Sequence, residues 1–297
     1  MSGGAARAGA CRPVTDVCAT GARGALRYAL PVTIAPRTPL SLARLAVTTI
    51  LVAAACLGGT ASAQREAFQQ MSDLLAQGYF NSAARLNGPD LIARYPEDPE
   101  AHFLFARALY LTGDRAGAAV ELAEAVRLAG EEGPAYAHLR GMLQAAEGDP
   151  AGALRTLQNA FLRTRDYEYA MDWGRVAWLA AEYDQAIAAF AAAAETTRGA
   201  REMWPHIDTG RLLMLQGRFT EAIAAFEAAI DVFERTDRGE AGPGSPGYVE
   251  AYYRLGQAYE QLGDVTQAET HYRAARTADP NYAPAIAALD RLSRSFD

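Results

Sequence analysis

The sequence predicts an all-α fold, a solenoid of about six helix-turn-helix units, because one pattern of small residues recurs along most of the chain. An Ala occupies the same place in each unit, at intervals of 35, 35, 33, 36 and 46 residues: Ala83, Ala118, Ala153, Ala186, Ala222 and Ala268. Five positions before each Ala stands a residue suited to a turn: Gly78, Gly113, Gly148, Ala181, Gly217 and Gly263. Glycine at this place ends one helix and lets the chain turn, so each unit is predicted to hold two helices.

Three further positions of the pattern predict that the two helices of a unit pack closely. A small residue stands twelve positions before the repeated Ala in units two to six: Ala106, Gly141, Gly174, Gly210 and Gly256. A bulky residue stands four positions after it: Leu122, Leu157, Phe190, Phe226 and Tyr272. A second Ala follows seven positions after it: Ala125, Ala160, Ala193, Ala229 and Ala275. Spacings of 3, 4 and 7 place these side chains on one helical face.

The last full unit makes the resemblance to a known family specific. It contains Tyr253-Arg254-Leu255-Gly256-Gln257-Ala258-Tyr259, then Leu262-Gly263-Asp264, Ala268, Tyr272, Ala275 and Asp279-Pro280. This unit resembles the tetratricopeptide repeat, and the resemblance covers residues 64–282. It implies a right-handed α-solenoid that binds proteins. Unit one departs from the pattern, since Gly88-Pro89 is expected to interrupt its second helix.

Two segments outside the regular repeat have their own predictions. Residues 283–297 keep apolar side chains at Ile286, Leu289 and Leu292, which favours a C-terminal helix that caps the open face of the last unit. The 46-residue interval contains Thr236 to Gly247, a stretch with four Gly and two Pro. It is predicted to be a flexible loop between units five and six, and the alternative is a lid that folds across the binding surface.

The amino-terminal residues 1–63 are interpreted as a targeting segment with a disordered extreme N-terminus. Leu45 to Leu57 is an uncharged apolar run of 13 residues preceded by Arg44, and Ala61-Ser62-Ala63 follows it. This order is typical of a secretory signal peptide and predicts cleavage between Ala63 and Gln64, hence a periplasmic or extracellular protein. Two alternatives remain open: a lipoprotein anchored at Cys56, and an uncleaved anchor. Residues 1–40 are long for a charged region, which indicates a start codon further downstream.

Charge and residue usage argue against several classes of function. Six Arg and one acid lie in residues 1–63, which leaves 22 Arg against 34 acids in residues 64–297. A domain this negative is a poor candidate for binding nucleic acid, because neutralising phosphates needs clustered basic side chains. The three cysteines all lie before residue 64, and the four histidines have no partner at a metal-ligand spacing. No catalytic motif is present, so the chain is expected to be neither an enzyme nor a cofactor or metal protein.

The family resemblance implies that the first helices of the units line a concave groove through positions 2, 5, 9 and 12 of each unit. With units starting at 99, 167, 203 and 249, the candidate groove residues are Phe103, Arg107, Tyr110, Met171, Arg175, Trp178, Ile207, Arg211, Met214, Tyr253 and Gln257. The unit that starts at 134 contributes His138, Met142 and Ala145 at the same positions, and His138 is interpreted as an ordinary groove or surface residue and not as a ligand. Apolar and aromatic groups edged by Arg suit an extended or helical peptide with acidic character.

The function predicted from these observations is a non-catalytic adaptor of the bacterial envelope that binds a peptide or protein segment in its groove. A lipid-anchored envelope assembly factor is the alternative within binding proteins, and an enzyme or small-ligand carrier is the alternative from another class. Family members that hold chaperone carboxylate tails use Lys and Asn at positions 5 and 9. This chain has neither residue there.

The signal-peptide interpretation predicts how the protein is processed. The apolar run and the small residues before Gln64 should direct cleavage there. Intact mass of the protein purified from the cell envelope should therefore equal that of a chain beginning at Gln64. A diacylglyceryl-modified chain beginning at Cys56 would replace this interpretation with the lipoprotein.

Overall fold

The computed structural model describes residues 61–236 and 245–294, and every regular element among them is helical. Two compact units divide the chain, and the second, Gly58–Asp297, contains all of these residues. In the described part of the chain no helix has the length and apolar content needed to cross a membrane. The targeting segment, except residues 61–63, lies outside the described residues, as do all three cysteines.

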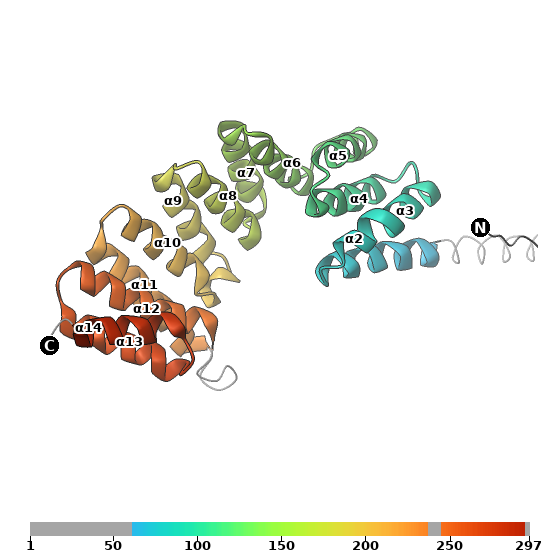
Figure 1. The fold of residues 1–297 in the computed structure, drawn as a ribbon. Coiled ribbons are helices and arrows are strands. Elements are labelled where there is room, and N and C mark those ends of the chain that lie inside the picture. The colour runs from blue at the N-terminus through green and yellow to red at the C-terminus, as the bar shows by residue number, and fades with distance from the viewer. Residues whose placement is uncertain (1–60, 237–244, 295–297) are drawn as a thin grey trace, which may run out of the picture. The chain divides into compact units, whose positions relative to one another are not determined.

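The helices follow one another in pairs, as the repeat predicts (Figure 1). The first unit comprises helical residues 61–76 followed by α2 (Phe80–Ser82), a π-helical turn (Ala83–Asn87) and α3 (Gly88–Arg94). The paired helices are α4 (Pro99–Thr112) and α5 (Arg115–Ala129), α6 (Pro134–Glu147) and α7 (Pro150–Thr164), α8 (Tyr167–Leu179) and α9 (Tyr183–Ala194), α10 (Trp204–Leu215) and α11 (Phe219–Thr236), and α12 (Pro246–Gln261) and α13 (Val265–Ala278). A 3-10 turn (Gly199–Arg201) precedes α10, and α14 (Ala283–Arg294) ends the series. The all-α repeat prediction is confirmed.

The turn inside each pair has the backbone geometry that the glycines predicted. Gly113 ends α4 with a φ of 88°, in the left-handed region where an L side chain is strained. Ala181 adopts the same region with a φ of 59°, although it carries a Cβ. The close packing of the two helices therefore imposes this turn even where glycine is missing. Helix α5, which follows Gly113, begins at an acidic cap: Asp114 Oδ1 accepts a hydrogen bond of 2.9 Å from the Gly117 N–H.

Close contact between the two helices of a pair depends on the missing Cβ of the first. A Cβ placed on Gly210 would lie 2.5 Å from Phe226 Cε1, and one on Gly256 would lie 2.5 Å from Tyr272 Cδ1. Both aromatic side chains are fully buried. Each ring therefore packs directly on the backbone of the partner helix, and the same relation joins Gly141 with Leu157 and Gly174 with Phe190.

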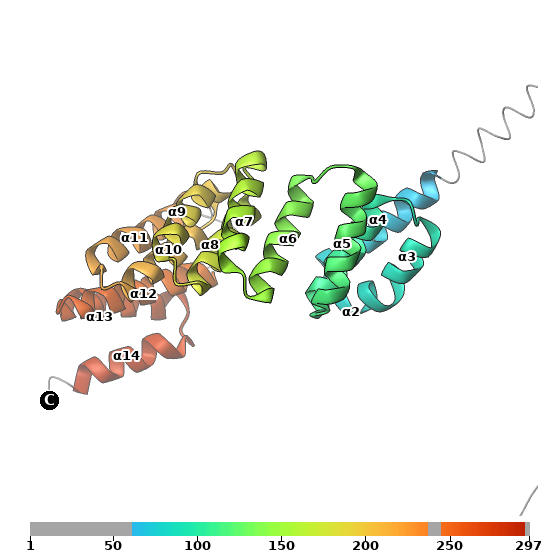
Figure 2. The ribbon, with the colours of Figure 1, turned by 90° about the horizontal axis from the view of Figure 1, so that it is seen from above.

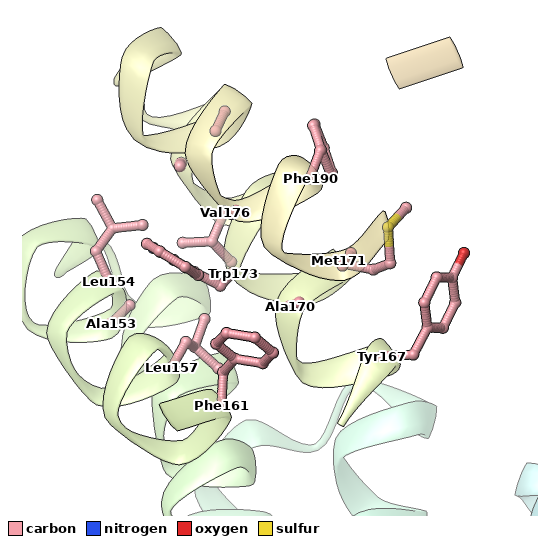
Figure 3. Close-up of a cluster of buried hydrophobic side chains, with 14 of the residues drawn as sticks. Ala153, Leu154, Leu157, Phe161, Tyr167, Ala170, Met171, Trp173, Val176 and Phe190 are labelled. Atoms are coloured by element: carbon pink, nitrogen blue, oxygen red, sulfur yellow. The ribbon is translucent and has the colours of Figure 1, made fainter. Parts of the chain in front are cut away.

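The largest core cluster joins α7, α8 and α9 (Figure 3). Trp173 points from α8 towards Leu154 and Leu157 of α7, and its ring centroid lies 6.2 Å from that of Phe161. Only 5% of Trp173 is exposed, so it belongs to the core. This contact fixes α8 against the preceding repeat.

The structure corrects the prediction for the second helix of unit one. Gly88-Pro89 does not interrupt that helix: the π-helical turn Ala83–Asn87 runs directly into α3, with Pro89 in its first turn. A wider turn of this kind accommodates a residue that has no N–H to donate. A Cβ on Gly88 would lie 2.1 Å from Phe105 Cδ2, so Gly88 also makes room for that ring.

The ends of the predicted loop between units five and six are helical, which is a second correction. Thr236 is the last residue of α11, and Pro246 and Gly247 begin α12; residues 237–244 lie outside the described residues. Phe233 and Tyr248 stack with ring centroids 4.1 Å apart, so the added turns of α11 and α12 pack on each other. Pro246 has no backbone N–H. It is compatible with a helix here because an N–H in the first turn would have no intrahelical acceptor.

Helix α14 follows α13 at the C-terminal end of the series (Figure 2). Its buried Ala288 and Leu292 join Ala268 and Tyr272 of α13 in one cluster. Arg291 forms an ion pair with Glu260 of α12. The predicted capping helix is therefore present and covers the last repeat.

Ala222 offers a test of the repeat register. It is fully buried where the helices of unit five meet, whereas Ala224 on the same helix is exposed. Ala222→Trp should lower the free energy of unfolding by at least about 1–3 kcal/mol because the added ring overpacks this contact. Ala224→Trp is the control and should leave the denaturant midpoint nearly unchanged. Equal midpoints for Ala222→Trp and wild type would contradict the register.

Candidate functional site

The predicted groove residues do not all reach the surface. Met171 and Ile207 are fully buried, so the structure corrects their assignment to the groove. Met171 belongs to a cluster with Leu212 of α10, and Ile207 belongs to one with Leu255 of α12. Position 5 in these units is covered by the first helix of the following repeat, and a partner cannot contact it.

Three of the predicted residues line one hollow. Phe103, Arg107 and Tyr110 of α4 face a hollow of about 560 Å³ between α4, α6 and α8, which we call the α4–α8 hollow. Phe103 is only 8% exposed, whereas Arg107 is exposed. The remaining lining residues are Leu111, Ala135, His138, Leu139, Met142, Asp166, Glu168, Tyr169 and Asp172.

His138 and Asp172 connect adjacent repeats at the floor of the α4–α8 hollow. His138 Nε2 lies 3.0 Å from Asp172 Oδ2, and the His138 ring stacks on Tyr169 with centroids 4.1 Å apart. Arg175 Nη1 donates a hydrogen bond of 3.0 Å to Asp172 Oδ1. Arg175 therefore holds this network in place and does not line the hollow.

Burial and the carboxylates of the α4–α8 hollow raise the pKa values of two tyrosines that line it. Burial raises the pKa of Tyr110 above its usual value, and the negative charge of Asp172 raises it further. Burial likewise raises the pKa of Tyr169, with a further contribution from Asp166. Both hydroxyls therefore remain protonated at neutral pH and can donate hydrogen bonds.

Four other predicted residues line a second hollow. Trp178, Arg211, Met214 and Gln257 face a space of about 620 Å³ between α8, α10 and α12, which we call the α8–α12 hollow. Arg291 of α14 also lines it. The remaining lining residues are Leu215, Phe219, Arg254, Glu260 and Gln261.

Arg211 is held over the indole of Trp178 by a buried acid. Its Cζ lies 4.9 Å from the Trp178 ring centroid, and its Nη1 donates a hydrogen bond of 3.0 Å to Asp208 Oδ1. Burial raises the pKa of Asp208, and the neighbouring Arg211 opposes that change. The guanidinium is therefore positioned by contacts beneath it while 38% of the side chain stays exposed.

Tyr253, the last of the predicted residues, lines neither hollow. Its ring packs 5.6 Å from those of Tyr272 and Tyr282, and its hydroxyl accepts a hydrogen bond of 3.1 Å from Gln257 Nε2. Tyr253 therefore orients Gln257 from the core side.

The sequence analysis missed the charged residues at position 6 of the last three units, which are Asp172, Asp208 and Arg254. These three could have been found from the sequence, because a charged residue stands at the same position of successive units, next to apolar positions. Arg291 could not be found this way because it comes from the capping helix. Within the described ranges, no group of three or more His, Cys, Asp or Glu is arranged to hold a metal ion.

Comparisons with known proteins agree with this architecture. A family model described as tetratricopeptide repeat matches residues 207–283. A crystal structure of MamA protein is similar with a TM-score of 0.51 and 19% identity, over 63% of this chain and 95% of that chain. A chain of the APC/C hetero-tetramer Cut9–Hcn1 gives a TM-score of 0.53 and 17% identity, over 77% of this chain and 42% of that chain. No curated protein matches the sequence. At these identities the structural likeness concerns the fold alone.

The link between His138 and Asp172 predicts a stability effect. Asp172→Ala should lower the free energy of unfolding by about 1 kcal/mol, because it removes the partly buried hydrogen bond that joins two repeats. Asp231→Ala is the matched control, since Asp231 pairs with Arg235 on an exposed surface. The control should cost less than about 0.5 kcal/mol. Equal losses in urea denaturation would show that Asp172 makes no special contact.

Proposed function

We propose that the chain, whose residues 207–283 match a tetratricopeptide-repeat model, is a non-catalytic adaptor that binds a peptide or protein segment along the exposed faces of α4, α6, α8, α10 and α12. The observation that carries this proposal is the pair of hollows on consecutive first helices, each lined by several predicted groove residues. Aromatic and Arg side chains contribute to both hollows, and these residue types supply most of the binding energy at protein interfaces.

Buried side chains beneath the first helices support the proposal that the partner binds a surface already formed before binding. Phe226, Met171 and Ile207 are fully buried beneath the exposed residues of the first helices. A partner therefore meets side chains that are already positioned, which lowers the entropy cost of association. Both hollows are open to solvent, as an extended segment requires, and neither is a closed pocket of the kind that favours a small-ligand carrier.

The proposed location is the bacterial envelope, after cleavage between Ala63 and Gln64. The sequence order of Arg44, the apolar run and Ala61-Ser62-Ala63 supports export. Attachment through Cys56 remains the alternative, and it would place the same binding surface at a membrane.

Site-specific photocrosslinking tests the proposed function. A benzoylphenylalanine placed at Tyr110 and, separately, at Leu215 should yield crosslinks to the same envelope protein, because the two positions line the two hollows. Val120 on α5 is the control position, since it is 67% exposed and lies on a second helix. The crosslinked species are separated by electrophoresis and identified by mass spectrometry.

Three changes provide a second measurement on the same preparation. Arg107→Ala, Arg175→Ala and Arg211→Ala together should reduce capture of the crosslinked partner, because two of these residues line the hollows and the third supports Asp172. A partner found only from Val120, or equal crosslinking from all three positions, would contradict binding along the first helices.

A further inference from the structure

His102 of α4 lies where the first two units meet, and both nitrogens of its ring face an acceptor. Nδ1 lies 2.6 Å from Glu121 Oε2 of α5, and Nε2 lies 2.9 Å from the backbone carbonyl oxygen of Pro96. Pro96 belongs to the connection between α3, which ends at Arg94, and α4, which begins at Pro99. One imidazole ring therefore links this connection to the second helix of the following pair.

The ring and its acid are largely shielded from water. His102 is 8% exposed, and 19% of the Glu121 side chain is exposed. A buried polar group that lacks a hydrogen-bond partner is costly, because little water is available to replace the partner. The number of protons held between the two side chains therefore decides whether their contact is favourable.

The geometry calls for one proton more than a neutral imidazole and an ionised carboxylate carry. A carbonyl oxygen only accepts hydrogen bonds, so Nε2 of His102 must donate its N–H to Pro96. In a neutral imidazole Nδ1 is then a lone pair, and it would face a second lone pair on Glu121 at 2.6 Å. A proton between Nδ1 and Oε2 removes this repulsion, whether it is assigned to the ring or to the carboxyl group.

The charges that act on the ring favour this additional proton. Burial lowers the pKa of His102, but its hydrogen bonds to Glu121 and Pro96 and the negative charges of Glu121 and Glu124 raise it further. The pKa of His102 therefore lies above its ordinary value. Both acids belong to α5, so the attraction acts across the interface between the paired helices.

The other charged groups near the ring belong to the connection and to α5. Glu97 and Asp98 follow Pro96 in the connection, and both are acids. Asp98 caps α4, since its Oδ1 accepts a hydrogen bond of 2.9 Å from the backbone N–H of the second residue of that helix. On α5, Arg127 pairs with Glu124 at 2.6 Å and neutralises part of its charge. The direct contact with Glu121 is therefore the main electrostatic partner of the ring.

We propose that His102, Glu121 and the Pro96 carbonyl form a pH-dependent switch between the first two units. With the proton bound, the contacts of the ring fasten the connection and the start of α4 to α5. When the proton leaves, the two lone pairs repel each other and this contact between the units opens. The switch goes beyond the proposed function, because it concerns the attachment of unit one and not the binding surface.

The switch stabilises the fold at low pH. In the unfolded chain the pKa of His102 returns to about 6.5, and in the folded chain it is higher. The stabilisation is therefore complete below about pH 6.5 and is lost as the pH rises through the folded value. His206 and His271 contribute in the opposite direction, because burial lowers their pKa values. A difference between variants isolates the switch, since these other contributions cancel.

Glu121→Gln distinguishes a proton-dependent switch from a purely structural contact. A glutamine side chain can donate its own N–H to the bare Nδ1 of a neutral ring, while Nε2 keeps its bond to Pro96. This variant should therefore keep the contact at high pH without the additional proton. In urea denaturation of the full chain, the midpoint of the wild type relative to Glu121→Gln should fall as the pH rises from about 5.5 to about 8.5.

Glu124→Gln is the matched control. It makes the same chemical change on the same helix, but the carboxylate that it removes pairs with Arg127 at an exposed surface. This variant should keep most of the pH dependence of the wild type. Circular dichroism at about pH 5.5 checks that both variants keep their helicity.

NMR titration of the histidine rings measures the proton directly. The chain has four histidines, and changing each of the other three to Gln in turn assigns the signal of His102 by elimination. In the wild type this signal should titrate above about pH 6.5. In Glu121→Gln it should titrate below that value, because the ring is buried and no longer faces a carboxylate.

The outcomes decide whether the switch exists. A high titration point for His102, together with a midpoint difference that falls towards alkaline pH, would support it. A titration point at or below the ordinary value, or a midpoint difference that stays constant with pH, would overturn it. If Glu121→Gln does not fold, the titration of His102 in the wild type decides between these results by itself.

Discussion

The fold depends on one contact that recurs in every well-formed repeat: a large side chain of the second helix pressed onto a residue of the first helix that has little or no side chain. Phe226 lies so close to Gly210 that a Cβ there would come within 2.5 Å of the ring. This contact sets how near the paired helices approach, and the tight turn between them follows from that separation. Ala181 adopts a φ of 59° in such a turn without being glycine, which shows that packing governs the local backbone.

The same contact determines which first-helix residues a partner can reach. With the second helix on one side and the next repeat on another, positions such as Met171 and Ile207 become core. The remaining exposed strip on each first helix is narrow, and neighbouring strips meet at the two hollows. Side chains such as Arg211 are then oriented by buried groups beneath them, here Asp208. The chemistry of the surface is therefore set by the packing of the repeats.

Sequence alone predicted the repeat register, because glycines and alanines at fixed spacing report local constraints that recur several times. It mispredicted Gly88-Pro89 and the ends of the Thr236 to Gly247 segment, because there tertiary contacts such as the Phe233–Tyr248 stack extend helices that local propensity would end. For the site, positions 9 and 12 were informative where no following helix covers them, as at Arg107 and Trp178. Position 5 was informative at Phe103 but not at Met171 and Ile207, since coverage by the next repeat cannot be read from one helix.

Helix α8 has the central place in this arrangement because it serves both hollows. Asp172 and Trp178 lie six residues apart on it, while Trp173 between them is packed against α7. Movement of α8 would displace both hollows together, so the separation between them is tied to a buried contact. A segment that matched one hollow but not the spacing would lose the second interaction, since the packed core prevents the surface from adjusting. The spacing of the two hollows therefore contributes to the specificity of the proposed binding surface.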